Sequence, residues 1–455
     1  MSGTYDVIVV GARCAGASTA MLLAREGLKV LLADRARFPS DIPHGHLIHR
    51  HGPRRLRDWG LLERLVATGC PPITTITRDT GSFALVGRDL VIDGVAAAYG
   101  PRRIALDKLL IDGAVEAGVE LRDGFAIEEY TGDGNRVTGI RGRDRAGGAR
   151  VTERAAIAVG ADGRGSRLAR TVRAAEYEVT PTVACWYFSY WSGVPADGLE
   201  LYERGERAIF GHPTNDGLFA LFVGWPISLQ QAVQSDLERS FMAVVDLVPG
   251  LSERVRGGRR EERFYGAANL PNFLRRPFGP GWALVGDAGC HKDPYLALGI
   301  CDALRDAALL AEAISEGLSA RCSLDKAMAD YERHRNEATL LDYRLNLDLA
   351  QFKPRPPEES RLYEALRGNQ EATNRFFMAR EGMIPPETFF EREITPISQS
   401  RRGSPGCRPG CACASPRRAP IQQGDRTAGR RPAGFGSARS DGASRCPTPI
   451  APALP

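Results

Sequence analysis

The sequence predicts an α/β protein in which a Rossmann-like nucleotide-binding unit carries an inserted antiparallel sheet and is followed by C-terminal helices. Three observations predict this fold. A buried strand, a glycine-rich turn, a helix and a second strand follow one another over residues 5–35. Two more strands, ending near residues 159 and 285, run into turns that contain Gly and Asp. An aromatic, strand-rich segment over residues 177–225 lies between these two turns. Strands that alternate with helices are typical of a parallel sheet.

The first turn has the features of a dinucleotide-binding fingerprint. Residues 6–10 are an apolar strand, residues 17–26 have helical spacing, and residues 29–33 form the next strand. Gly11 permits the sharp turn, and Gly16 lets the helix approach the strand closely. The helix N-terminus offers free N–H groups to a pyrophosphate. Asp34 ends the second strand, where a carboxylate can accept both ribose hydroxyls. Arg13 replaces the middle glycine of the pattern, so its side chain must point away or lie along the phosphates.

The loop over residues 36–50 is rich in histidine. His44, His46, His49 and His51 lie close together in the sequence, but no carboxylate or cysteine completes a metal set. We therefore expect no metal and a loop that passes over a ligand. The residues that follow predict a helix at 53–67, a hairpin at 73–93, a helix at 106–117, and strands at 119–122, 125–130, 137–144 and 149–159.

The segment from residue 177 to 225 reads as several antiparallel strands. Six of its aromatic residues could form one face of a sheet. For most of them plain sheet core is the favoured interpretation, although a sheet this aromatic often walls an apolar ligand pocket. They are Trp186, Phe188, Tyr190, Phe219, Phe222 and Trp225. Helices are predicted at 229–248, from 299 to about 317, at 323–350 and at 362–378.

Composition bounds the class of protein. The chain has 455 residues, 43% hydrophobic and 25% charged, which is typical of a globular protein. No apolar run approaches a membrane span and no signal sequence is apparent, so we expect a cytoplasmic location and no stable membrane insertion. The six cysteines before residue 397 include no CxxC pair, which argues against a dithiol redox centre.

Residues 397–455 differ from the rest of the chain. They consist mainly of Arg, Pro, Gly, Ala and Ser, cannot bury a core, and are expected to be disordered. Ten arginines and two aspartates give this segment a charge of +8, which leaves −3 for the remainder and no sign of a nucleic-acid surface. Cys407, Cys411 and Cys413 lack a fourth metal ligand. The sequence leaves open whether this tail is native or the product of a shifted reading frame.

Taken together, the turns at residues 11–16, 162–163 and 286–287 resemble those of the class A FAD-dependent monooxygenases of the aromatic hydroxylase type. The resemblance covers roughly residues 5–395. It implies a Rossmann-like FAD-binding domain, an inserted antiparallel-sheet substrate domain and a C-terminal helical region. The implied parts are 1–75, 101–175 and 276–320 for the FAD-binding domain, 76–100 and 176–275 for the substrate domain, 321–396 for the helices, and 397–455 for the tail.

The resemblance also implies roles for individual residues. The pyrophosphate turn would comprise Gly11, Arg13, Cys14, Ala15 and Gly16, with Asp34 and Arg35 on the adenosine side. The flavin side would comprise Arg103, Asp162, Gly163, Asp287, Leu298 and Gly299. Ala297 and Leu298 stand where the family more often has Gly and Gln. No side chain is obliged to be an acid or base, and His46 and His291 are the candidates for tuning a phenol or the flavin.

The implied reaction is a monooxygenation. NADPH or NADH reduces FAD, O₂ adds to form a flavin C4a-hydroperoxide, and one oxygen atom passes to a small apolar or aromatic substrate. The protein would act as a monomer or homodimer. A flavin-dependent halogenase shares the fold but should show a WxWxIP-type motif and a suitable lysine; residues 224–227, GWPI, do not match. A geranylgeranyl-type double-bond reductase and a degenerate flavin-binding protein without turnover remain as alternatives.

Overall fold

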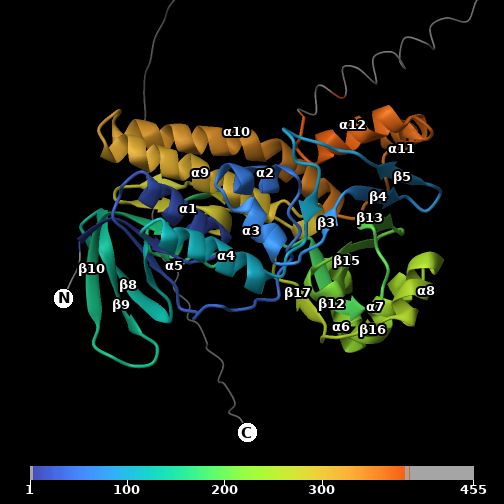
Figure 1. The fold of residues 1–455 in the computed structure, drawn as a ribbon, viewed down its shortest axis with the longest axis horizontal. Coiled ribbons are helices and arrows are strands. Elements are labelled where there is room, and N and C mark those ends of the chain that lie inside the picture. Colours follow the sequence, from blue (N-terminus) through green and yellow to red (C-terminus); the bar gives the residue numbers. More distant parts are fainter. Residues whose placement is uncertain (1–3, 385–388, 390–455) are drawn as a thin grey trace, which may run out of the picture. The chain divides into compact units, whose positions relative to one another are not determined.

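The computed structural model describes residues 4–384 and Phe389, all within one compact unit formed by residues 1–400 (Figure 1). The fold is mixed α/β, as the sequence predicts, and contains two large sheets. The predictions for Cys407, Cys411, Cys413 and the tail concern residues outside those described. Among the described residues, no helix has the length and apolar character needed to cross a bilayer.

The first sheet has the strand order β19-β20-β10-β1-β2-β7. Its parallel part consists of β1 (Thr4–Val10), β2 (Val30–Ala33), β7 (Glu120–Arg122), β10 (Val151–Gly160) and β20 (Trp282–Leu284). The antiparallel neighbours are β19 (Phe278–Gly279) and the hairpin β8 (Phe125–Asp133) and β9 (Arg136–Asp144).

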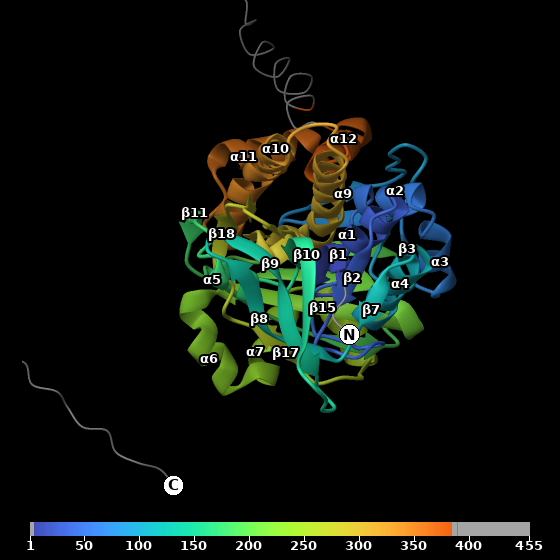
Figure 2. The ribbon, with the colours of Figure 1, turned by 90° about the vertical axis from the view of Figure 1, so that its left-hand side faces the viewer.

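Both faces of this sheet are buried. Val7 and Val9 of β1 pack with α1 (Cys14–Arg25), α4 (Arg103–Glu116) and α9 (Gly299–Leu318). Ile8 and Val10 point to the other face, which the hairpin β8–β9 covers (Figure 2). Successive side chains on a strand alternate between faces, so a continuous apolar run is what a sheet covered on both sides requires.

The second sheet has the order β16-β12-β15-β14-β13-β4-β5, with β17 beside β12. Its strands are β4 (Thr75–Asp79), β5 (Ala84–Gly87), β12 (Ala184–Ser192), β13 (Gly198–Glu203), β14 (Ala208–Pro213), β15 (Leu218–Pro226), β16 (Arg259–Arg260) and β17 (Tyr265–Ala267). One face packs against α7 (Leu237–Val245) and α8 (Pro249–Gly257), which follow α6 (Gln230–Ser235). The sheet thus joins two segments far apart in sequence, since β4 pairs in parallel with β13.

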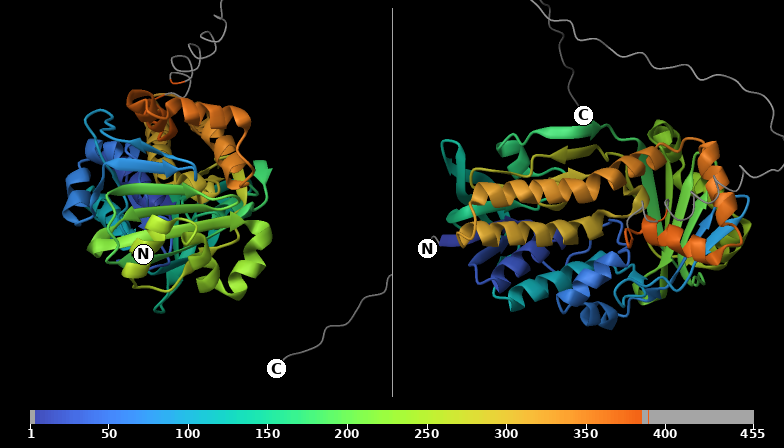
Figure 3. Two further views of the ribbon diagram at one scale, coloured as in Figure 1. Left: turned by 90° about the vertical axis from the view of Figure 1, so that its right-hand side faces the viewer. Right: turned by 90° about the horizontal axis from the view of Figure 1, so that it is seen from above.

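The C-terminal helices complete the unit. The long helix α10 (Leu324–Ala350) lies beside α9, and α11 (Pro357–Leu366) and α12 (Gln370–Arg380) lie at the end of the second sheet near β5 (Figure 3). The short elements are β3 (Pro72–Ile73), β6 (Ala98–Tyr99), α5 (Arg167–Thr171), β11 (Glu176–Thr180), β18 (Asn272–Arg275) and β21 (Cys290–His291). Strand pairing shows which strands share a sheet, but it does not divide the chain into domains. The domain boundaries given by the sequence therefore stay predictions.

Three predicted helices are each split in two. The helix expected at 53–67 is α2 (His51–Asp58) and α3 (Leu62–Ala67), separated by Gly60 at φ +74°. The stretch at 362–378 breaks at Gly368, φ +82°. The stretch at 229–248 breaks at Asp236, whose carboxylate accepts a hydrogen bond from the Arg239 N–H and begins α7. The helical spacing of apolar residues continues across such breaks, because the helices before and after the break both turn an apolar face to the protein interior.

Candidate functional site

The three glycine-containing turns meet at one edge of the first sheet. Val10 of β1 lies opposite Gly160 of β10, and Gly160 lies opposite Leu284 of β20. The carboxyl ends of these three parallel strands are therefore neighbours, which is where ligands bind in open α/β sheets. Residues that are more than 270 positions apart in the sequence come together here.

The turns touch one another through glycines. Gly11 has φ +106°, and a Cβ there would lie 2.3 Å from the Ala161 carbonyl oxygen. A Cβ on Gly16 would lie 1.7 Å from the Gly11 oxygen. A Cβ on Gly286 would lie 2.7 Å from the Ala15 Cβ. These glycines are thus required for close packing of the turns.

Asp34 fixes the first turn. Its Oδ2 accepts a hydrogen bond from the Ala12 N–H at 2.7 Å, and its Oδ1 accepts one from the Ala36 N–H at 2.7 Å. Each carboxylate oxygen retains acceptor capacity for a ribose hydroxyl. Arg35 is exposed beside it. The roles of Asp34 and Arg35 toward a cofactor stay predictions.

Arg13 does not stand alone in the turn. Its Nη1 lies 2.5 Å from Oδ2 of the fully buried Asp107 on α4. Arg103 binds both oxygens of the same carboxylate, at 2.9 and 3.2 Å. Cys14 donates to Asp107 Oδ1 at 3.5 Å, and burial raises the pKa of this thiol to about 12. Asp107 therefore holds two of the three predicted cofactor-side arginines, Arg13 and Arg103, and the sequence did not predict this partner.

Two further acids stand at the other turns. Asp162 Oδ2 accepts from the Arg167 N–H at 2.7 Å. Within residues 4–384, its buried Oδ1 has no hydrogen-bond partner. Asp287, partly exposed, lies in the turn that Gly286 begins at φ +61°. Gly163, at φ +78°, has open space where a Cβ would be.

His44, in the loop after β2, lies among all three turns. Desolvation and the guanidinium groups of Arg103, Arg164 and Arg13 lower the pKa of His44 to about 4, against the opposing effect of Asp287. The residue is nevertheless solvent-exposed. Charged groups from all three turns thus act on His44, so this loop runs near the edge where the turns meet.

The segment before α9 follows the Asp287 turn. Asp293 is 2% exposed and caps a short turn at Pro294–Leu296, and Ala297 has a left-handed backbone, φ +52°. Leu298 is buried, Gly299 begins α9, and no side chain caps this helix start. Burial raises the pKa of Asp293 to about 7, although hydrogen bonds from the Trp186 indole and the Tyr295 N–H oppose the shift.

The aromatic residues of the second sheet lie on two faces. Trp225 packs on Phe241 of α7, and Phe219 belongs to the same helix-covered core, so these two lie in the sheet core and not on a face shared with the other four. Four remain on the opposite face, which we call the aromatic face, and Phe210 and His212 join them from β14. They are Trp186, Phe188, Tyr190 and Phe222. Phe210, Phe222 and Phe188 form one row across three strands.

The aromatic face contacts the histidine-rich loop through Tyr190 and the segment before α9 through Trp186. Tyr190 donates a hydrogen bond to His46 Nε2 at 3.0 Å, and His46 Nδ1 donates to the Gly100 oxygen at 2.9 Å. Burial and the nearby His212 keep the pKa of His46 well below its ordinary value, and burial lowers that of His212 to about 4. Both imidazoles are therefore neutral at pH 7. Both nitrogens of His46 are engaged within the protein.

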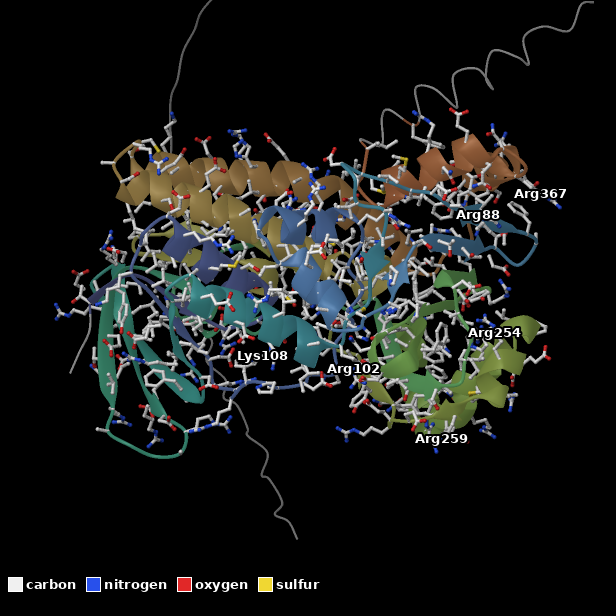
Figure 4. All side chains as sticks on the ribbon, viewed as in Figure 1. Arg88, Arg102, Lys108, Arg254, Arg259 and Arg367 are labelled. Atoms are coloured by element: carbon white, nitrogen blue, oxygen red, sulfur yellow. The ribbon has the colours of Figure 1, made fainter. Side chains whose placement is uncertain are left out.

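Arg102 packs on Tyr190 at the edge of the aromatic face. Its guanidinium lies 4.2 Å from the centre of the Tyr190 ring and forms ion pairs with Asp41 and Glu262, at 2.9 and 2.8 Å. It stands where the start of α4 approaches the second sheet, whereas Lys108 lies further along α4 (Figure 4). The positive charge is thus neutralised by two acids at the surface.

His291, the second histidine candidate, has a structural environment. Its Nδ1 donates to the Pro271 oxygen at 2.5 Å and its ring stacks on Phe273. Over the described ranges, no group of three or more potential metal ligands comes together. Two small hollows, lined by residues such as Phe278 and Trp282 or Leu85 and Leu366, lie away from the three turns.

The residues at the turns fit a dinucleotide. Helix α1 begins with no side chain capping its first N–H groups, which suits a pyrophosphate. Asp34 and Asp287 place carboxylates at the first and third turns, and within residues 4–384 the buried Oδ1 of Asp162 has no hydrogen-bond partner. Fold and site together define a nucleotide-binding α/β protein with an attached aromatic sheet.

Comparison with known proteins identifies the family. The family model described as "FAD binding domain" matches residues 4–340, so the chain belongs to this family. The resemblance to class A FAD-dependent monooxygenases is confirmed at the level of this family, which also includes halogenases. The chain is therefore an FAD-dependent oxidoreductase.

Individual relatives carry different activities in their names. A 1H-pyrrole-2-carbonyl-[peptidyl-carrier protein] brominase of Pseudoalteromonas luteoviolacea is 24% identical over 329 residues, 69% of this chain and 78% of that protein. The FAD-dependent monooxygenase OpS4 of Beauveria bassiana is 24% identical over 338 residues, 67% and 75% of the two chains. The structure of the flavin-dependent brominase Bmp2 superposes with a TM-score of 0.72 at 18% identity, covering 88% of this chain and 99% of the other, which confirms the fold.

Proposed function

We propose that the protein is a NAD(P)H-dependent FAD monooxygenase that adds one oxygen atom from O₂ to a small apolar or aromatic molecule. The observation that carries this proposal is the aromatic face, formed by Trp186, Phe188, Tyr190 and Phe222, which contacts the histidine-rich loop and the segment that follows the Asp287 turn. Apolar walls bind an aromatic ring and exclude water from the reacting atoms.

In this proposal the predicted residues hold FAD. The turn from Gly11 to Gly16 binds the pyrophosphate, Asp34 and Arg35 bind the adenosine side, and the remaining predicted residues bind the flavin side. These are Arg103, Asp162, Gly163, Asp287, Leu298 and Gly299. FAD, when bound, supplies the redox chemistry and the activation of O₂. The protein's contribution is to orient the substrate and to keep solvent away.

The charges at the aromatic face favour an uncharged substrate. His46 and His212 are neutral at pH 7 because burial lowers the pKa of each. The guanidinium of Arg102 is already paired with Asp41 and Glu262. A substrate carboxylate would therefore find no free cation among these three groups, whereas a neutral ring or a phenol loses little on leaving water.

Halogenation is the second candidate, because a relative named as a brominase is among the similar proteins. The lysine expected of a halogenase is not at the site among the described residues of the N-terminal region. Lys29 lies over the Tyr5 ring, and Lys108 pairs with Asp112 on α4. This arrangement favours oxygen transfer to the substrate over halogen transfer.

The experiment is a product analysis under defined conditions. Purified protein is loaded with FAD, and NADPH or NADH oxidation is followed with phenol, indole and pyrrole under ¹⁸O₂, with and without bromide. The proposal predicts a product that is heavier by one ¹⁸O atom. A brominated product would establish halogenation, and a reduced double bond formed without O₂ would establish a reductase. Bound FAD with no turnover on any of these substrates would favour the non-catalytic alternative.

A further inference from the structure

One buried carboxylate joins the two halves of the candidate site. Asp293 Oδ1 accepts a hydrogen bond from the Trp186 indole Nε1 at 3.0 Å and a second from the Tyr295 N–H at 3.0 Å. Trp186 belongs to the aromatic face, and Asp293 belongs to the segment between the Asp287 turn and α9. This hydrogen bond therefore connects the second sheet to the segment that leads into α9.

The main chain around Asp293 is held from two further elements. The Asp293 N–H donates to Asn272 Oδ1 at 2.6 Å, and the Asp293 carbonyl accepts from Asn346 Nδ2 at 2.8 Å. Asn346 also accepts from the Leu296 N–H at 2.9 Å. Both asparagines are fully buried. Strand β18, helix α10 and strand β12 thus fix one short segment together.

The segment has a fourth attachment, at the carbonyl group of Leu296. This carbonyl accepts a hydrogen bond from His49 Nε2 at 2.9 Å. Ala297 then adopts its left-handed conformation, and α9 begins two residues later at Gly299. A non-glycine residue in that conformation needs support from its surroundings. The contacts to Asp293 and Leu296 provide it.

The side chain of Asp293 is also unusual in its own right. It is 2% exposed, and in the described part of the chain its Oδ2 is buried without a hydrogen-bond partner. The neighbouring side chains are aromatic, with Trp186, Tyr295 and Phe352 in mutual contact. A buried carboxylate with one unpaired oxygen in aromatic surroundings costs free energy. Of the two hydrogen bonds that its other oxygen accepts, the one from Trp186 is the link to the second sheet.

We propose that Asp293 is a positioning residue that ties the aromatic face to the segment preceding α9, so that Trp186 and the start of α9 keep one fixed relation at the FAD site. This inference rests on the proposed function, since it assigns the start of α9 to the flavin side.

The test uses variants that cut the connection from either side. Trp186→Phe removes the indole N–H and keeps an aromatic ring. Asp293→Ala removes the acceptor, whereas Asp293→Asn keeps an oxygen that accepts both hydrogen bonds. The matched control is Trp191→Phe, because Trp191 is on the same strand, is similarly buried and packs on Phe241 at the opposite face. The readouts are the FAD dissociation constant and the position of the visible flavin bands.

We expect the FAD dissociation constant to rise about tenfold in both Trp186→Phe and Asp293→Ala. A factor of this size corresponds to the loss of one hydrogen bond to a carboxylate. The flavin bands should shift in the same direction in both. The double variant should be no worse than either single one, because each removes the same link. Asp293→Asn and Trp191→Phe should resemble the wild type.

Unchanged FAD binding and bands in Trp186→Phe, or additive effects in the double variant, would overturn the inference. If Asp293→Ala fails to fold, the comparison of FAD binding between Trp186→Phe and Trp191→Phe still tests the inference. A wild-type protein that binds no FAD would refute the proposed function and this inference with it. A wild type that binds FAD, with variants that do not differ from it, would refute only the role of Asp293.

Discussion

At the scale of single residues, two glycines show how different the demands of a left-handed backbone can be. Gly11 has φ +106° and lies against the Ala161 carbonyl, whereas Gly27 has φ +85° and nothing within 4 Å of a Cβ. The first residue is needed for conformation and for space. The second is needed for conformation alone.

Gly11→Ala is therefore expected to destabilise the protein much more than Gly27→Ala. The backbone strain of about 1–2 kcal/mol is common to both variants. Gly11→Ala adds a backbone clash that forces the turns apart, so we expect a total loss of at least about 3 kcal/mol and loss of FAD binding. Urea unfolding and FAD titration measure the two effects. Equal losses in both variants would show that the turns are not packed as described.

The sequence predicted those residues whose reasons are local. Gly11, Gly16 and Asp34 follow from a strand, a turn and a helix within one stretch of chain. Asp107 and Asp293 were not predicted, because Arg13 and Trp186, which they connect to the site, are about 100 positions away in the sequence; Arg103, four positions before Asp107, is its local partner. A carboxylate on an ordinary helix or after a turn carries no local mark of such a partner. Only the paired positions in space reveal it.

At the scale of elements, strand β15 shows the limit of counting aromatic residues. Phe219 and Phe222 are three positions apart, so they must point to opposite faces of the strand. Phe219 is 1% exposed and packs in the core with α7, whereas Phe222 stacks on Phe188 at 4.7 Å on the aromatic face. The aromatic composition predicted the sheet, but the strand register was needed to divide the residues between its faces.

Phe219→Ala should thus mainly lower stability, whereas Phe222→Ala should mainly lower activity. Loss of Phe219 leaves a cavity in the core and should cost about 3–5 kcal/mol of unfolding free energy. Loss of the partly buried Phe222 should cost less stability but weaken substrate-dependent NAD(P)H oxidation. Denaturant unfolding and steady-state kinetics on both variants check this pair. A variant of Phe222 that loses only stability would remove the aromatic face from the proposed site.

At the scale of the whole molecule, one buried ion pair attaches the C-terminal helices to the N-terminal part. Arg50 is fully buried and donates to both oxygens of Glu381, just after α12, at 2.8 Å each. It also donates to the carbonyls of Ala96 and Thr74, at 3.1 and 2.8 Å. His49, which holds the Leu296 carbonyl, lies 3.6 Å from the same carboxylate. The helices at the end of the chain thereby reach the segment before α9.

This pair makes stability depend on pH in a defined direction. Burial alone would raise the pKa of Glu381. The nearby His49 and Arg50 outweigh this effect and hold the pKa at about 2, below its ordinary 4.5. The stabilisation is complete above about pH 4.5 and is lost as the pH falls toward 2, because the unfolded chain takes up the proton first. The loss should be roughly 1.4 kcal/mol for each pH unit in that range.

Glu381→Gln should consequently cost about 3–5 kcal/mol at pH 7, because it leaves the buried Arg50 without its counter-charge. The difference from the wild type should narrow by about 2 kcal/mol between pH 4.5 and pH 3, since only the wild type loses the pair's contribution there. Urea unfolding at several pH values measures both quantities. The control is Glu371→Gln on the exposed side of α12. A pH-independent difference would mean that Glu381 has the same pKa in the folded and the unfolded chain, and that apolar packing of Phe376 and Phe377 holds the C-terminal helices instead.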